Sequence, residues 1–213
     1  MPQTRPSGRR QADRSRHTRE HVLSATVGLI RMEGLPSASP VRITRQSGMS
    51  WGAVQHHFGS KEELLRTIVR RSRDEFQQAI EEQEYAGLDL AERLSRFVDA
   101  AWQHYQSDVF LASVEITFWH RNNGLAIDGD IAGDAGRTTA RTREMARRTL
   151  EGTDGDVDGL LSATEYMHCV LTGLAFQKIL VGEASQVGLH LAQCKQVMVS
   201  MVSRSPDGRG RTG

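Results

Sequence analysis

Residues 50–61 combine side chains that suit contact with the bases and phosphates of DNA. They read Ser-Trp-Gly-Ala-Val-Gln-His-His-Phe-Gly-Ser-Lys. If this stretch is helical, Val54 and Phe58 share one face and turn inward. The other face then carries Trp, Gly, Ala, Gln and His, an uncharged surface that suits the major groove. Gln55 is able to pair with adenine or to reach a phosphate, and both contacts stay open.

Neighbouring elements must hold this helix in place. Apolar spacing predicts a helix over about residues 15–33, and Ser39-Pro40 marks the start of a short second helix. Ser50 is the expected N-cap of the third helix. Ser60 caps a long fourth helix whose first turn is acidic, as the helix dipole favours. Two short helices joined by a glycine turn, under a longer first helix, predict a helix-turn-helix.

The charge of the chain is strongly divided. Residues 1–61 hold nine Arg and one Lys against three acids, a net charge of +7, and residues 62–213 carry a net charge of −6. Such asymmetry suggests an anionic partner for the N-terminal part. Residues 1–14 are expected to be a disordered basic arm, either solvated or in contact with DNA. Residues 204–213 are expected to be a disordered tail.

Residues 50–64 resemble the signature of the TetR family. In that family a recognition helix runs into a His-Phe segment and then into a Gly-Ser-Lys-x-x-Leu helix start. Residues 42–50 resemble the family's second helix and turn, and the likeness covers about residues 15–65. It implies an all-α, homodimeric transcription regulator, most often a repressor released from DNA by a small ligand. The chain departs from the pattern at Gln55, where the family usually has a tyrosine that touches a phosphate.

The residue types and the resemblance together predict an operator-binding surface on a domain spanning residues 15–60. The partner implied is a pseudo-palindromic DNA duplex. His57 is expected at the phosphate backbone, and Lys61 is expected to bind a phosphate beside the helix N-terminus. The predicted DNA-contacting residues are Ser39, Arg42, Arg45, Ser50, Trp51, Gly52, Ala53, Gln55, His56, His57 and Lys61.

Residues 61–203 are predicted to form a helical domain for ligand binding and dimerisation. Ten of the twelve aromatic residues follow position 65. Each one alone fits a helical core, but as a set with nearby polar groups they suit a cavity for an apolar small molecule. The predicted ligand-binding residues are Trp102, Tyr105, Phe110, Glu115, Phe118, Trp119, Tyr166 and Cys169.

A heptad pattern marks the end of the chain. Val187, Leu191, Cys194, Met198 and Met201 are spaced by four, three, four and three residues, and residues 160–174 carry a comparable stripe. In a single domain these residues form core. The family resemblance implies instead a four-helix interface between two copies of the chain.

One acidic stretch matches the calcium-binding loop pattern D-x-[DN]-x-[DN]-G-x5-E. It begins at Asp154, has its glycine at Gly159 and ends at Glu165. The alternative is a connection between helices in which Asp156 or Asp158 is an N-cap. Such loops normally occur in pairs and no second one is present, so no metal is expected. A ligand- or calcium-responsive sensor that acts through protein contacts is the alternative function.

Other classes of protein find little support. No apolar run is long enough for a membrane span, and no secretory leader is recognised. The two cysteines fit a reducing compartment, so a cytoplasmic location is expected. Adjacent side chains on a helix point about 100° apart, so neither His56-His57 nor His168-Cys169 makes a chelate or a catalytic pair. We expect no enzyme activity and no cofactor.

Overall fold

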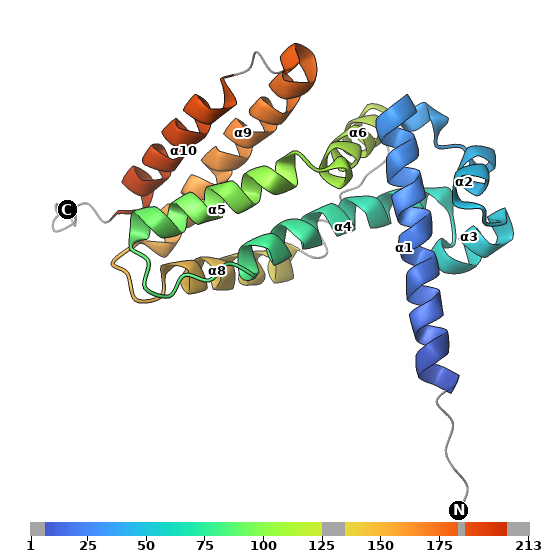
Figure 1. Ribbon diagram of the computed structural model, residues 1–213, viewed down its shortest axis with the longest axis horizontal. Helices are drawn as coiled ribbons and strands as arrows, with labels where there is room; N and C mark the ends of the chain where they lie inside the picture. Colours follow the sequence, from blue (N-terminus) through green and yellow to red (C-terminus); the bar gives the residue numbers. More distant parts are fainter. Residues whose placement is uncertain (1–6, 125–134, 183–185, 204–213) are drawn as a thin grey trace, which may run out of the picture. The chain divides into compact units, whose positions relative to one another are not determined.

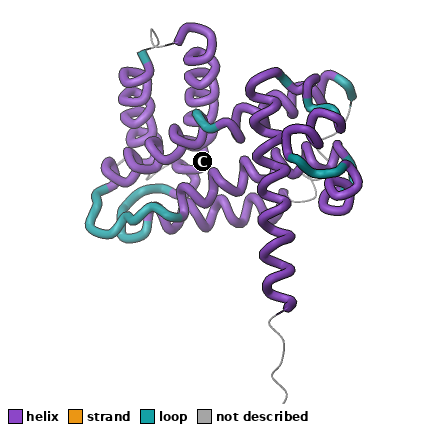
Figure 2. Tube along the Cα trace, turned by 45° about the vertical axis from the view of Figure 1, so that its right-hand side comes forward, coloured by secondary structure: helices purple, strands orange, loops and turns teal. Residues whose placement is uncertain are grey.

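The structure, a computed structural model, describes residues 7–124, 135–182 and 186–203 (Figure 1). Over these residues Figure 2 contains helices and loops and no strand, which confirms the predicted all-α class. None of these helices has the length and apolar character that a lipid bilayer requires. The helices are α1 (Ser7–Glu33), α2 (Pro40–Ser47), α3 (Trp51–Phe58), α4 (Lys61–Glu81), α5 (Leu90–Tyr105), α6 (Asp108–Asn122), α8 (Ala135–Leu150), α9 (Val157–Val181) and α10 (Val187–Val202).

The chain divides into two compact units. The first takes in Met1–Arg73 and Asp108–Ile127, and the second Asp74–Ser107 and Asp128–Gly213. The first unit therefore includes α6, which the predicted boundary at residue 60 left outside the DNA-binding domain. The reason lies in packing, because Val109, Ala112 and Ile116 on α6 are buried in the same core as α1 and α3.

The core of the first unit holds the helix-turn-helix together. Ile30 of α1, Ile43 of α2, Val54 and Phe58 of α3 and Leu64 of α4 are all buried in one cluster. The predicted inward positions Val54 and Phe58 of the third helix are thereby confirmed. Burying side chains of this size contributes about 1.5–3 kcal/mol each, so this core fixes α3 on its support.

Hydrogen bonds confirm the predicted helix starts. The Ser39 hydroxyl accepts from the Arg42 amide at 3.4 Å, and the Ser50 hydroxyl accepts from the Ala53 amide at 3.2 Å. Between α2 and α3 the chain turns at Gly48, whose φ of 65° lies in the left-handed region. A glycine adopts that conformation without the steric cost of a side chain.

Helix α1 corrects the predicted N-terminal arm. The arm was expected to be disordered over residues 1–14, but residues 7–14 are helical, because α1 begins at Ser7 rather than near Ser15. The expectation is based on the lack of regularly spaced apolar residues in this stretch. Such spacing shows whether a helix is buried on one face, but not whether the stretch is helical. Arg, Gln and Ala are good helix formers, so a helix nucleated by the buried part of α1 extends through them.

Helices α5, α9 and α10 supply much of the core of the second unit. Leu160, Met167 and Leu171 on α9 are fully buried, as are Cys194 and Met198 on α10. The stripes predicted to form a seam between two chains therefore lie largely inside one chain, with only Met201 of the named α10 residues exposed. Heptad spacing specifies one face of a helix but not the partner that covers it, and here α5, α9 and α10 cover one another.

The acidic stretch before α9 is a helix start, as the alternative of a connection between helices predicts. Asp156 is the N-cap of α9 and accepts from the Gly159 amide at 2.8 Å, and Asp158 forms an ion pair with Arg143 at 2.8 Å. Glu165 lies on α9 itself, about two helical turns after its first residue, Val157. Among the described residues no group of three or more acidic, His or Cys side chains is arranged to hold a metal ion.

Candidate functional site

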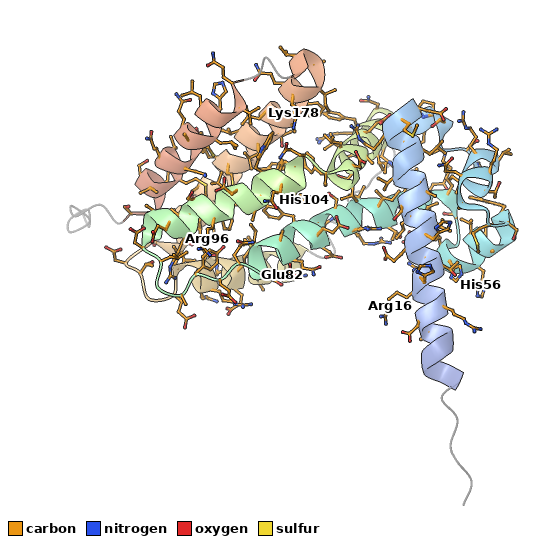
Figure 3. All side chains as sticks on the ribbon, viewed as in Figure 1. Arg16, His56, Glu82, Arg96, His104 and Lys178 are labelled. Carbon is orange, nitrogen blue, oxygen red and sulfur yellow. The ribbon has the colours of Figure 1, made fainter. Side chains whose placement is uncertain are left out.

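Helix α3 presents one face to the core and the other to solvent. Val54 and Phe58 are 1% and 5% exposed, whereas Gly52, Gln55 and His56 are exposed. Figure 3 shows His56 on the side of α3 that faces away from α1. The outward face is thus short, uncharged and free to enter a groove about 12 Å wide, the width of the DNA major groove.

Trp51 departs from the predicted arrangement. It was expected to point away from the core, but it is half-buried and packs against the core cluster. Side chains on a helix lean toward its N-terminus, so a large ring in the first turn reaches back over the preceding turn and the core. Ala53 is also half-buried. The fully exposed part of the surface therefore starts at Gly52 and centres on Gln55 and His56.

The other predicted DNA-contacting residues surround α3. Arg45 on α2 is exposed, and Lys61 at the start of α4 is half-buried. Arg42 forms an ion pair with Glu33, so a phosphate would have to compete with that carboxylate. Ser39 and Ser50 already accept capping hydrogen bonds, which leaves their hydroxyl hydrogens able to donate.

Helix α1 holds the C-terminal ends of α2 and α3 with two basic side chains. The Arg19 guanidinium donates to the carbonyl of His57 at the end of α3, and its carbon atom Cζ lies 4.5 Å from the centre of the Phe58 ring. The His21 Nε2 atom lies 2.9 Å from the carbonyl oxygen of Ser47, the last residue of α2. Sequence reasoning assigned Arg19 no role inside the protein and so missed this contact. Its place one helix turn before the first buried residues of α1 is the only signal for it.

Arg19 also affects the titration of His57. Burial lowers the pKa of His57, and the nearby His56 and Arg19 lower it further. The free protein therefore favours a neutral His57 imidazole, which donates or accepts a hydrogen bond according to its tautomer. A phosphate placed beside it would act in the opposite direction and raise this pKa.

The residues predicted to bind a ligand are divided between the two units. Phe110, Glu115, Phe118 and Trp119 belong to the first unit, and Trp102, Tyr105, Tyr166 and Cys169 to the second.

Within the first unit, Glu115 has a structural role, because its carboxylate accepts from the Leu35 amide at 2.6 Å. Phe110 is buried, whereas Phe118 and Trp119 are exposed on α6. Aromatic composition alone does not show which of these rings is buried and which is exposed.

In the second unit the predicted residues lie in two places. Trp102 and Tyr105 are buried on α5, and the Tyr105 hydroxyl bonds the Nδ1 atom of His168 on α9. Tyr166 and Cys169 line an open depression of about 280 Å³ between α9 and α10. A larger cavity of about 330 Å³ lies elsewhere, between the end of α4, the start of α5 and the end of α8, and includes none of the predicted residues.

Comparison with known proteins points to one family. Residues 22–68 match the model of the family described as bacterial regulatory proteins, tetR family. The HTH-type transcriptional regulator BetI of Stenotrophomonas maltophilia is 31% identical over 102 residues, which are 47% of this chain and 52% of that protein. The chain thus spans about half the length of that relative. BetI of Paraburkholderia phytofirmans is 25% identical over 67% of this chain and 78% of that protein.

Solved structures agree in fold. A full-length TetR regulator from Streptomyces fradiae, TylP, aligns with a TM-score of 0.64 at 21% identity over 90% of this chain and 89% of that one. A TetR-family structure from a Shewanella species aligns with a TM-score of 0.59 over 88% of this chain and 99% of that one, at 16% identity. The match at residues 22–68 falls on the helix-turn-helix core described above, and the fold likeness extends over most of the chain. The chain is thus similar to the TetR family of bacterial regulatory proteins in the residues of its helix-turn-helix and in its fold.

Proposed function

We propose that this protein is a sequence-specific, DNA-binding transcription regulator, most simply a repressor that a small molecule releases from its operator. The main observation behind the proposal is the outward face of α3, where Gln55 and His56 are exposed. Val54 and Phe58, on the opposite face, are buried in the core and hold the helix in place. The charge of +7 over residues 1–61 supplies the attraction to phosphates. The relatives named above as transcriptional regulators support the same function.

The protein acts as a homodimer through α9 and α10. Although the heptad stripes are buried within the chain, these two helices leave large apolar side chains exposed, among them Leu180 at 82%, Leu189 at 52% and Tyr166 at 36%. Exposed apolar side chains on neighbouring helices mark an interaction surface, because a second protein chain that covers them removes apolar area from water. A two-fold dimer would place two α3 helices on the two halves of a palindromic site.

The protein works in the cytoplasm, where its operator is, and it has no enzymatic step. The alternative of a calcium-responsive sensor has lost its main support, because Asp156 and Asp158 are committed to a helix cap and an ion pair.

Two substitutions separate reading of sequence from binding of phosphate. Gln55→Ala is expected to relax base preference at one symmetric pair of operator positions, with a cost of about 1–3 kcal/mol on the preferred sequence. Lys61→Ala is expected to weaken all sequences alike and to reduce the salt dependence by about one counterion per subunit. Fluorescence anisotropy with a selected duplex and with its single-position variants measures both. If Gln55→Ala lowers affinity equally for every duplex, Gln55 binds phosphate; if neither variant changes DNA binding, the assigned surface is wrong.

A further inference from the structure

The cavity of about 330 Å³ in the second unit differs in kind from a gap in an apolar core. Its walls include the apolar side chains of Ile80 and Met145, the ring of Tyr85, and the charged side chains of Arg93 and Arg148. The volume lies at the lower end of the range for small-molecule sites. An apolar wall beside a few polar groups is the arrangement that orients an amphipathic ligand.

Arg93 is the central feature of this cavity. It is 8% exposed, and it donates to three backbone carbonyls: from Nε to Leu88 at 2.9 Å, and from Nη1 to Thr149 at 3.1 Å and Glu151 at 2.6 Å. Over the described ranges no carboxylate pairs with it. A buried guanidinium is normally paired with an anion, because removing its charge from water is costly. The three carbonyls bind only Nε and Nη1 of Arg93. The N–H groups of Nη2 therefore remain able to donate to an anion.

Charged side chains of both signs line the cavity. Arg148 adds a second cation to the wall, against Glu81 and Glu151. Arg141 binds Glu81 through two hydrogen bonds of 3.0 and 3.2 Å, and this pairing lowers the pKa of Glu81. Of the two lining carboxylates, Glu81 is therefore paired with Arg141, which also pairs with Asp74 at 3.8 Å, and Glu151 remains beside Arg93 and Arg148.

Tyr85 supplies a further unfilled donor. Its hydroxyl oxygen is buried and has no hydrogen-bond partner within the described residues. The Thr149 hydroxyl, which donates to the Met145 carbonyl, lies close enough to lower the pKa of Tyr85, but its oxygen does not meet hydrogen-bond geometry with the Tyr85 hydroxyl. Burial raises the pKa of Tyr85, so the phenol keeps its proton. A buried donor without an acceptor is costly, and a ligand oxygen would relieve that cost.

We propose that this cavity binds a small monocarboxylate with an apolar body, its carboxylate held by Arg93 with support from Arg148 and Tyr85, and its body against Ile80 and Met145. The guanidinium fork matches the two oxygens of a carboxylate. Ile80 and Glu81 belong to α4, the helix that begins directly after α3, so the bound acid contacts this helix. That the acid then acts as the effector rests on the proposed function, whereas its binding does not.

Calorimetry on the full chain without DNA tests the site, with benzoate and hexanoate as probes beside benzamide and hexanamide. Each acid is expected to bind at least tenfold more tightly than its amide, because the charge-assisted contacts to Arg93 need a carboxylate. Arg148→Gln and Tyr85→Phe are expected to weaken the acids by roughly three- to tenfold, the effect of about 0.7–1.4 kcal/mol. Both variants leave the carbonyl bonds of Arg93 intact, whereas Arg93→Gln is expected to abolish binding but also to loosen the end of α8.

Arg147→Gln is the matched control, because Arg147 is an exposed neighbour on α8 that pairs with Glu144 and does not line the cavity. It is expected to bind the acids like the unaltered chain. No saturable binding of either acid, equal affinity for acid and amide, or Arg148→Gln behaving like Arg147→Gln would overturn the proposal. DNA binding by the ligand-free chain is measured separately, so a failed carboxylate site and a failed DNA-binding function give different results.

Discussion

Arg19→Ala is expected to weaken operator binding by roughly 10- to 100-fold without removing a contact to DNA. Arg19 donates to the His57 carbonyl and stacks over Phe58, so it fixes the end of α3 that carries Gln55 and His56. A hydrogen bond from a charged donor contributes about 1.5–3 kcal/mol, and a cation over an aromatic ring about 0.5–2 kcal/mol. If about 1.4 kcal/mol of this is lost in DNA binding, each subunit loses a factor of about ten.

The salt dependence shows whether Arg19 acts by position or by charge. A phosphate contact contributes about one counterion to the slope of affinity against salt, and a positioning residue contributes none. The slope is therefore expected to stay unchanged in Arg19→Ala, and Arg19→Lys, which keeps the charge but loses the planar stack, should recover affinity only in part.

Arg16→Ala is the control, because Arg16 is exposed on α1 and lies on the side away from α3 in Figure 3. A tenfold loss in Arg16→Ala as well would assign both arginines to phosphate contacts, and full recovery in Arg19→Lys would show that Arg19 acts through its charge and not through its position.

Gly159→Ala is expected to reduce the free energy of unfolding by about 1–3 kcal/mol, the usual cost of forcing an extra carbon into a packed site. A Cβ atom at Gly159 would lie 2.6 Å from the backbone oxygen of Met201, which cannot rotate away as a side chain does. The same region is tied by the Asp156 amide, which donates to the Val202 carbonyl at 2.9 Å. The start of α9 and the end of α10 must therefore separate to admit the methyl group.

Gly28→Ala provides the comparison in a helix interior. A Cβ atom there meets nothing within 4 Å, so alanine is expected to stabilise α1 by about 0.5–1 kcal/mol through helix propensity. Urea unfolding of both variants at one protein concentration measures the two effects with opposite signs. Equal or greater stability of Gly159→Ala would show that α9 and α10 do not meet as described.

Local sequence rules predicted much of the structure of the first unit. Ser39, Ser50 and the inward positions Ile43 and Val54 follow from capping and helical period, which act over a few residues. The same rules failed where an outcome depends on distant partners. Trp51 turned toward the core because a cluster from α1 lies within its reach, and the helical start of α1 at Ser7 has no apolar signal.

The second unit shows why a heptad pattern does not identify the surface that covers it. Cys194 and Met198 satisfy a heptad whether another chain or α5 covers them, and here burial within the chain is complete. The calcium pattern failed for a similar reason, because Gly159 is required by the close approach of Met201 and not by a loop around an ion. No sequence pattern singled out Arg93. Its three acceptors are backbone carbonyls, which any residue type supplies, and they are distant in sequence or outside any motif.

The most direct test of the central claim is selection of binding sites from random duplex DNA with the ligand-free, full-length chain, followed by a salt titration on the selected duplex. The account predicts an inverted repeat with half-sites related by two-fold symmetry, and an affinity that falls steeply as salt rises because several phosphates are neutralised. No enriched sequence from a folded preparation, or an affinity that does not respond to salt, would contradict the claim that α3 of this protein reads DNA.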